Sequence, residues 1–315
     1  MFNLIQKRRY FFLLSAAVIV PGLIIMLYST ITTGAPFRLS IDFIGGSIYE
    51  LAFTEAGATE ANIRDAFAAQ GDETVVVQQL GSPDEHRWSV RSLIQDQATS
   101  DLVLAELETI APIDRTLLRS ESVSATVGQE VARAAVVAVL VAGAVIIGFI
   151  VIAFRQVPRA FRYGVCAVAA MLHDVLVVCS LISLAGLVLG WEVDTLFLTA
   201  LLTVVGFSIQ DTIVIFDRIR ENIPRYLGEP YETIVNRSIL ETIHRSLATQ
   251  LNAFFVMAAI LLFGGDTIRQ FIAILFIGML SGTYSSIFTA VPLLVSWEKG
   301  EIPFVNQRHT ATAEG

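Results

Sequence analysis

The sequence predicts an α-helical membrane protein with six transmembrane helices and one α+β domain inserted between the first two. Hydrophobic residues make up 54% of the 315-residue chain and charged residues only 16%, whereas about a quarter of a typical soluble domain is charged. The mean hydropathy is +0.66. Several apolar runs are also long enough to cross a bilayer core of about 30 Å, which takes about 20 helical residues.

Six apolar runs are predicted to span the membrane. The runs at 11–31, 134–154 and 271–297 contain no charged residue, those at 163–189 and 195–216 each contain an acidic residue, and the run at 247–263 is shorter but uncharged. The first run is about twice as long as the apolar core of a signal peptide, and it lacks a clear cleavage site. It is therefore expected to remain as a transmembrane helix.

Basic residues predict the orientation of these helices, because Arg and Lys are enriched in cytoplasmic loops. They precede the first run and follow the second and the fourth: Lys7, Arg8 and Arg9, then Arg155, Arg159 and Arg162, then Arg218, Arg220 and Arg225. Both termini are therefore expected in the cytoplasm, in a multi-pass protein of the cell membrane. The predicted parts are the first helix with its N-terminal segment (1–31), an extracytoplasmic domain (32–131), five further helices (132–297) with a cytoplasmic loop (217–246), and a cytoplasmic tail (298–315).

The segment 32–131 is acidic, with six Arg and sixteen Asp or Glu residues. Its pattern predicts strands at 47–53, 73–80, 86–93 and 115–122 and helices at 59–69 and 100–110. This β-α-β-β-α-β order is that of the ferredoxin-like fold, in which two helices cover one face of a four-stranded sheet. The other face could bind an extended ligand, although a fold alone does not establish binding.

Catalytic and metal-binding patterns are not visible in the sequence. Cys166 and Cys179 lie thirteen residues apart in one predicted helix, about 20 Å along its axis, and cannot form a disulfide with each other. No cluster of metal ligands, nucleophile elbow or phosphate-binding loop is present. We therefore expect neither an enzyme nor a cofactor, and no nucleic-acid partner.

The strongest functional signal is an acidic residue inside the fourth apolar run. Asp211 lies in a polar cluster with Gly206 and Ser208, and a central Asp costs about 2.5–3.5 kcal/mol on insertion scales. Because a low dielectric disfavours the charged carboxylate, such a group can switch between its protonated and charged forms. A membrane potential supplies about 2.3 kcal/mol per charge for each 100 mV, which is close to the cost of placing one Asp inside the membrane. We interpret Asp211 as a proton carrier.

His173 and Asp174 form a second titratable pair, near the middle of the third apolar run. They could extend a proton path, or they could make structural hydrogen bonds to a neighbouring helix. Adjacent residues point about 100° apart on a helix, so the two side chains are not expected to face one cavity together.

A charged segment and an amphipathic segment follow the fourth run. Asp217 and Arg218 belong to the charged segment, and most such runs are solvated faces. Beyond Pro230, the apolar residues Val235, Ile239, Ile243 and Leu247 recur at four-residue steps. This pattern predicts an amphipathic helix that lies along the membrane before the fifth span.

Arg245 stands at the junction with the fifth span. It could reach into the bundle and pair with a carboxylate, or extend to lipid phosphates. Gln250 and Asn252 are expected to make hydrogen bonds between helices. Gly278 and Gly282, with Ser281 and Ser285, are expected to allow close helix packing.

At the ends of the inserted domain, glycines in 41–46 and 127–130 suit a hinge or a tight turn, or mark an ordinary turn where a strand begins.

Several segments resemble one known family. The segment GFSIQDTIVIFDRIREN at 206–222 closely resembles the fourth-helix signature of the SecF branch of the SecD/SecF family, in the RND superfamily. Supporting resemblances are IDFIGG at 41–46, LHDV at 172–175, Arg245, and GTYSSIF at 282–288. Together they extend from Lys7 to Trp297. The family commonly has Asn where this chain has Gln210.

The resemblance implies a subunit that uses a proton gradient to promote protein export. Asp211 would be the proton-coupling residue and Arg245 its electrostatic partner. His173 and Asp174 are further proton-coupling candidates on the strength of the residues themselves, apart from the resemblance. Asp42, Phe43, Gly45, Gly46, Gly206, Ser208, Asp217 and Arg218 would be motif or hinge positions. The implied partners are SecD as the other half, the SecYEG channel, YajC and YidC, SecA indirectly, an unfolded preprotein and the lipid bilayer.

Two other functions remain open. A proton-driven exporter of small molecules in the same superfamily would share the intramembrane Asp, although its outer domains should be larger. A scaffold that only stabilises the channel would use Asp211 structurally, and Asp211→Asn would then leave export intact.

Overall fold

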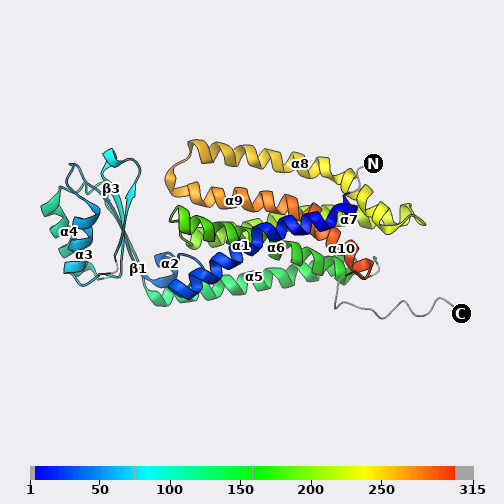
Figure 1. Ribbon diagram of the computed structural model, residues 1–315, viewed down its shortest axis with the longest axis horizontal. Coiled ribbons are helices and arrows are strands. Elements are labelled where there is room, and N and C mark those ends of the chain that lie inside the picture. Colours follow the sequence, from blue (N-terminus) through cyan, green and yellow to red (C-terminus); the bar gives the residue numbers. More distant parts are fainter. Residues whose placement is uncertain (1–3, 74, 95, 156, 158, 302–315) are drawn as a thin grey trace. The chain divides into compact units, whose positions relative to one another are not determined.

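The computed structural model describes residues 4–301 apart from 74, 95, 156 and 158. The chain forms two compact units, of which one is Leu39–Val136 and the other is helical and consists of the rest of the chain (Figure 1). Most of the tail expected at 298–315, from residue 302 onward, lies outside the described residues.

Six helical segments of the described chain are long and apolar enough to cross a membrane, which confirms the predicted class. They are α1 (Arg8–Thr33), α5 (Ala125–Ala153), α6 (Ala160–Val188), α7 (Thr195–Arg225), α8 (Tyr231–Phe263), and a last segment made of α9 (Asp266–Ser285), the π-helical η3 (Ser286–Ala290) and α10 (Val291–Glu298). A π-helical turn leaves the regular hydrogen-bond pattern locally, and such turns are common at functional sites.

The other unit has the predicted ferredoxin-like order. Its elements are β1 (Gly46–Ala52), α3 (Glu60–Ala69), β2 (Val76–Leu80), β3 (Arg87–Ser92), α4 (Gln97–Ile110) and β4 (Arg119–Val123). All strand pairs are antiparallel, in the order β2-β3-β1-β4. Alternate strand residues such as Tyr49, Leu51 and Val90 are buried against Phe67 and Leu107 of the two helices, as the two-residue repeat of a strand requires.

The two predicted glycine turns of this unit have different outcomes. A short helix, α2 (Ile41–Ile44), leads into Gly45 and Gly46, whose φ angles of 78° and 125° are left-handed, so the chain turns there, at the start of β1, and this fits both a tight turn and an ordinary turn where a strand begins. At the other end α5 already begins at Ala125, and the expectation of a turn at 127–130 is wrong. A Cβ atom on Gly128 would lie 2.5 Å from the carbonyl oxygen of Phe43, so this glycine allows close packing instead.

The prediction of a separate amphipathic helix before the fifth span is also wrong. Residues from Tyr231 to Phe263 form one continuous helix, α8. Val235 and Ile239 are fully buried in the core of the helical unit. The apolar stripe therefore packs against other helices and does not lie on the membrane surface.

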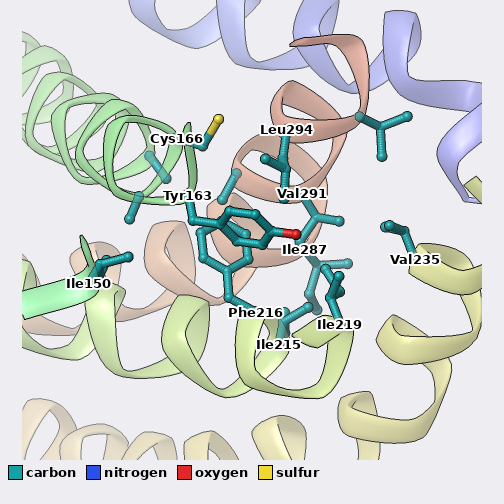
Figure 2. Close-up of a cluster of buried hydrophobic side chains, with 14 of the residues drawn as sticks. Ile150, Tyr163, Cys166, Ile215, Phe216, Ile219, Val235, Ile287, Val291 and Leu294 are labelled. Carbon is teal, nitrogen blue, oxygen red and sulfur yellow. The ribbon is translucent and has the colours of Figure 1, made fainter. Parts of the chain in front are cut away.

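A hydrophobic core fills the end of the helical unit at which most of its arginines lie, which we call the arginine-rich end. Figure 2 shows Tyr163 and Phe216 at its centre, with Cys166 nearby; the two rings meet edge to face, with centroids 5.2 Å apart. Here α7 continues through the charged segment to Arg225. Asp217 pairs with Arg220 at 2.6 Å, and Arg218 pairs with Glu241 of α8 at 2.6 Å.

Close packing joins α7 and α9. A Cβ atom on Gly278 would overlap the side chain of Val204, and one on Gly282 would lie 3.2 Å from the Cα atom of Ser208. Both glycines of the small-residue pair therefore allow the close helix contact that the sequence predicts.

Candidate functional site

Two acidic side chains are buried in the middle of the helical unit. Asp174 of α6 has no exposed surface, and Asp211 of α7 is 4% exposed. Burying an ionisable group costs free energy unless partners satisfy it. The partners of the two carboxyl groups differ sharply, and they divide the site into two parts.

Asp174 is surrounded by hydroxyl groups. Its Oδ2 atom accepts hydrogen bonds from Ser208 of α7 at 2.5 Å and from Ser285 of α9 at 2.6 Å. Its Oδ1 atom accepts one from Ser281 of α9 at 2.6 Å. Three helices therefore meet at this carboxyl group. We call Asp174, the three serines and His173 together the Asp174 cage.

His173 completes the cage. Its Nδ1 atom lies 3.0 Å from Oδ1 of Asp174, and its Nε2 atom lies 2.9 Å from the hydroxyl of Ser15 in α1. The two adjacent side chains bond to each other, but of the two only His173 lines the cavity between α1, α6 and α9, in agreement with the expectation that they would not face one cavity together. The imidazole ring is long enough to turn back toward its neighbour while its other nitrogen reaches α1, and it stacks on Tyr284 with centroids 6.0 Å apart.

Asp211 has a single hydrogen-bond partner among the described residues. The side-chain amide of Gln250 in α8 donates from Nε2 to Oδ2 of Asp211 over 2.8 Å. Oε1 of Gln250 and the hydroxyl of Ser246, one turn earlier on α8, are buried and bond to no other described residue. The O and N atoms of an amide exchange places when it turns over. Gln250 can therefore donate to a carboxylate or accept a hydrogen bond from a protonated acid.

A hydrogen-bond partner of Asp174 lies one helical turn from Asp211 on α7. Ser208, which donates to Asp174, stands three residues before Asp211, and residues three apart share a helix face. Thr212 donates to the carbonyl oxygen of Ser208 at 3.1 Å. Polar side chains thus run from Gln250 on α8, across α7, to the Asp174 cage.

Arg245 is not brought to Asp211 in this structure. Its side chain is exposed, and it forms no ion pair with another described residue. The physical reason is the rotation of α8. Ser246 and Gln250 are four residues apart and turn the same face inward, whereas Arg245 points about 100° away from Ser246.

The remaining motif positions lie elsewhere. Gly206 is exposed on α7, and a Cβ atom added there would meet nothing within 4 Å. Asp217 and Arg218 form the ion pairs of the arginine-rich end. Asp42, Phe43, Gly45 and Gly46 belong to the other unit, where they form α2 and the turn that follows it.

Sequence reasoning missed four members of the site. The sequence pattern favours a packing role for Ser281 and Ser285, yet both donate to Asp174. Ser15 and Tyr284 were not singled out. The four-residue spacing of the two serines was the available signal, because it places two hydroxyl groups on the same face of an apolar helix.

The arrangement suits the binding and release of protons. It combines titratable side chains with hydroxyl groups that can rotate between donor and acceptor roles. Within the part of the chain that the structure describes, no group of three or more His, Cys, Asp or Glu side chains is placed to hold a metal ion.

Comparisons with known families give a consistent result. Residues 103–300 match the family described as "Protein export membrane protein SecD/SecF, C-terminal", and residues 30–56 match the "SecD/SecF GG Motif". The second match contains Gly45 and Gly46, and the first contains both buried acids.

Individual relatives and a solved structure agree with these matches. The chain is 46% identical over 302 residues to the protein translocase subunit SecF of Anaerolinea thermophila, covering 96% of each chain. It is 34% identical to the protein translocase subunit SecDF of Thermus thermophilus, covering 94% of this chain and 38% of that one. A crystal structure of SecDF, a translocon-associated membrane protein from Thermus, superposes with a TM-score of 0.76 at 32% identity, covering 95% of this chain and 39% of that one.

Proposed function

The chain belongs to the SecD/SecF family of protein-export membrane proteins, as a SecF-type subunit of a protein translocase, and we propose that it uses the proton-motive force to promote late steps of preprotein export. It would do so with SecD, docked on the SecYEG channel. Asp211 is the proposed proton-coupling residue. The proton gradient is the energy source, with no cofactor and no enzymatic reaction.

The observation that carries this proposal is the surroundings of Asp211. The carboxyl group is buried in α7, and its one described partner is an amide that can serve both protonation states. A structural carboxylate would be expected to have as many donors as Asp174 has. The sparse contacts of Asp211 allow it to gain and lose a proton without breaking several hydrogen bonds.

The membrane location follows the same reasoning. The protein is a multi-pass membrane protein, and we place it in the cell membrane with both termini in the cytoplasm. Arginines gather at one end of the helices, where Arg8, Arg159 and Arg162 pair with Glu232 and Glu298. Basic residues are enriched on the cytoplasmic side, so the ferredoxin-like unit would face outward.

A stripe on α7 supports SecD as the other half of the unit. Thr199, Thr203, Gly206 and Gln210 are all exposed, and their spacing of four, three and four residues places them on one helix face. We call this face the α7 stripe. The side chain of Gln210 bonds to no other described residue, and an unsatisfied amide in an apolar medium costs about 2–7 kcal/mol. A partner helix that covers the stripe would remove this cost.

The SecDF relatives make SecD the natural occupant of the stripe. In those proteins the matched segment accounts for 38% of a chain that is named for both subunits. Contacts with SecYEG, an unfolded preprotein, and SecA indirectly are part of the proposal, with YajC and YidC as possible further partners.

We expect Gly206→Leu to weaken copurification of this chain with co-expressed SecD by about tenfold, because overpacking a close helix contact costs about 1–3 kcal/mol. The matched control is Gly148→Leu on α5, where an added Cβ atom also meets nothing within 4 Å. Equal recovery of SecD with both variants would show that the α7 stripe is not the SecD interface.

We expect inverted membrane vesicles that lack this chain to lose the stimulation of preprotein translocation by an imposed proton gradient, while ATP-driven translocation continues. The chain, supplied again, should restore the stimulation. A parallel loss of channel protein and of ATP-driven translocation would favour the scaffold function. Failure to copurify with the translocon would favour the small-molecule exporter.

A further inference from the structure

Both carboxyl oxygens of Asp174 are fully hydrogen-bonded within the Asp174 cage. A carboxylate offers about four acceptor sites on its two oxygens. In the cage three hydroxyl groups and the Nδ1 atom of His173 occupy them. All four positions suit donors, which fits the ionised form of Asp174.

A positive charge beside a buried carboxylate stabilises its ionised form. Among the described residues that bond to Asp174, His173 is the only one that can carry such a charge. The Nδ1 atom must carry a proton in order to donate to the carboxylate. The protonation state of the ring is therefore decided at its other nitrogen, Nε2.

The partners of Nε2 can accept either state. When the ring is neutral, the hydroxyl of Ser15 donates to Nε2 over 2.9 Å. When Nε2 carries a proton, it donates to Ser15, and the Ser15 hydroxyl can turn toward the hydroxyl of Tyr284, 3.5 Å away. The hydroxyl of Tyr284 itself donates to the carbonyl oxygen of Phe11 at 2.7 Å. When Nε2 takes up the proton, the rotation of the Ser15 hydroxyl is enough to keep these groups hydrogen-bonded.

Space is available beside the ring. A cavity of about 390 Å³ lies between α1, α6 and α9, and its mostly apolar lining includes Ser15, His173, Ser281 and Tyr284. The ring of His173 therefore borders open space and is not enclosed on every side by packed side chains.

Few other titratable groups face the ring from the elements packed around it. Asp174 lies on α6 itself, Asp211 stands one turn from Ser208 on α7, and Tyr284 lies on α9. In the contact with α1, the neighbours are Ser15 and the Phe11 carbonyl, and η3 has no titratable side chain. Among the described residues, Asp174 is therefore the acidic group that contacts the ring.

We propose that His173 and Asp174 form a second proton-binding site, separate from Asp211, in which Asp174 stays ionised and the ring of His173 takes and releases the proton at Nε2. Ser15 and Tyr284 transmit the change to α1 and α9. The purpose of this site rests on the proposed proton-driven function, but its existence can be tested without any transport assay.

The test is a titration of the histidine rings by solid-state ¹⁵N NMR, on the full chain in lipid bilayers. The chain has four histidines, and the His173 signals are identified by their loss in His173→Gln. We expect Nδ1 to stay protonated throughout, while Nε2 changes from unprotonated to protonated on acidification. In Asp174→Asn, protonation of Nε2 should require a proton concentration at least about tenfold higher. His244→Gln, an exposed change on α8, should leave the titration unaltered.

A neutral ring with its proton on Nε2 would overturn the proposal, as would a ring that does not titrate while the protein stays folded. Both outcomes are measured in the NMR titration of the unsubstituted chain, so the proposal can be tested even if Asp174→Asn fails to fold. The outcome is also independent of Asp211. If His173 titrates as expected but Asp211→Asn leaves gradient-driven export intact, the proposed coupling fails and the second site remains.

Discussion

Gly278→Leu is expected to destabilise the helical unit by about 3 kcal/mol or more, near the upper end of what overpacking costs. The Cβ atom alone would overlap Val204, which is fully buried in α7, and the rest of the leucine would have no space. The same α7 surface continues to Ser208, which donates to Asp174. The substitution should therefore also separate α9 from the Asp174 cage.

The measurement is thermal unfolding of the purified chain in detergent, compared with Gly148→Leu. The control introduces the same side chain at an exposed helix position, where leucine has a better helix propensity than glycine. The smaller change Gly278→Ala should be partly rescued by Val204→Ala, which removes the overlapping methyl groups. If Gly278→Leu melts like the control, α7 and α9 are not packed as closely as the structure shows.

The helical elements could be predicted because the bilayer constrains them strongly. A span needs about 20 apolar residues and internal hydrogen bonding, so the six runs were visible in composition alone. The position of a helix is harder to predict where the bilayer does not constrain it. The segment before the fifth span has the same apolar stripe whether it lies on a membrane or packs on other helices, and only the structure shows Val235 and Ile239 in the core.

The site could be predicted only in part. Two acids in apolar helices stand out because their burial is costly. Their partners do not, because the rotation of each helix about its axis decides which side chains meet. Arg245 and Gln250 are five residues apart on α8, and sequence alone does not show which of them faces Asp211. The hydroxyl groups of Ser281 and Ser285 were overlooked because serine is also a common small residue at close helix contacts.

Asp211→Asn is expected to abolish the effect of a proton gradient on export while leaving the protein folded. Asparagine has nearly the same shape as aspartate, and its amide can still bond to Gln250, so packing should change little. It cannot bind and release a proton at working pH. Because Asp211 has one described partner, the loss should appear in coupling and much less in stability.

A nearby acid on the same helix provides a matched control. Asp217 lies six residues further along α7 and pairs with Arg220 at the arginine-rich end, where its side chain is 45% exposed. Asp217→Asn removes one carboxylate from α7 but leaves both buried carboxyl groups, those of Asp174 and Asp211, in place. It should retain the stimulation of export by the gradient.

The proton-coupling role of Asp211 is tested by measuring how much an imposed proton gradient increases completed preprotein translocation in inverted membrane vesicles that carry Asp211→Asn at the normal protein level. We expect no stimulation with Asp211→Asn and full stimulation with Asp217→Asn. Undiminished stimulation with Asp211→Asn would contradict the proton-coupling role of Asp211 and favour a scaffold.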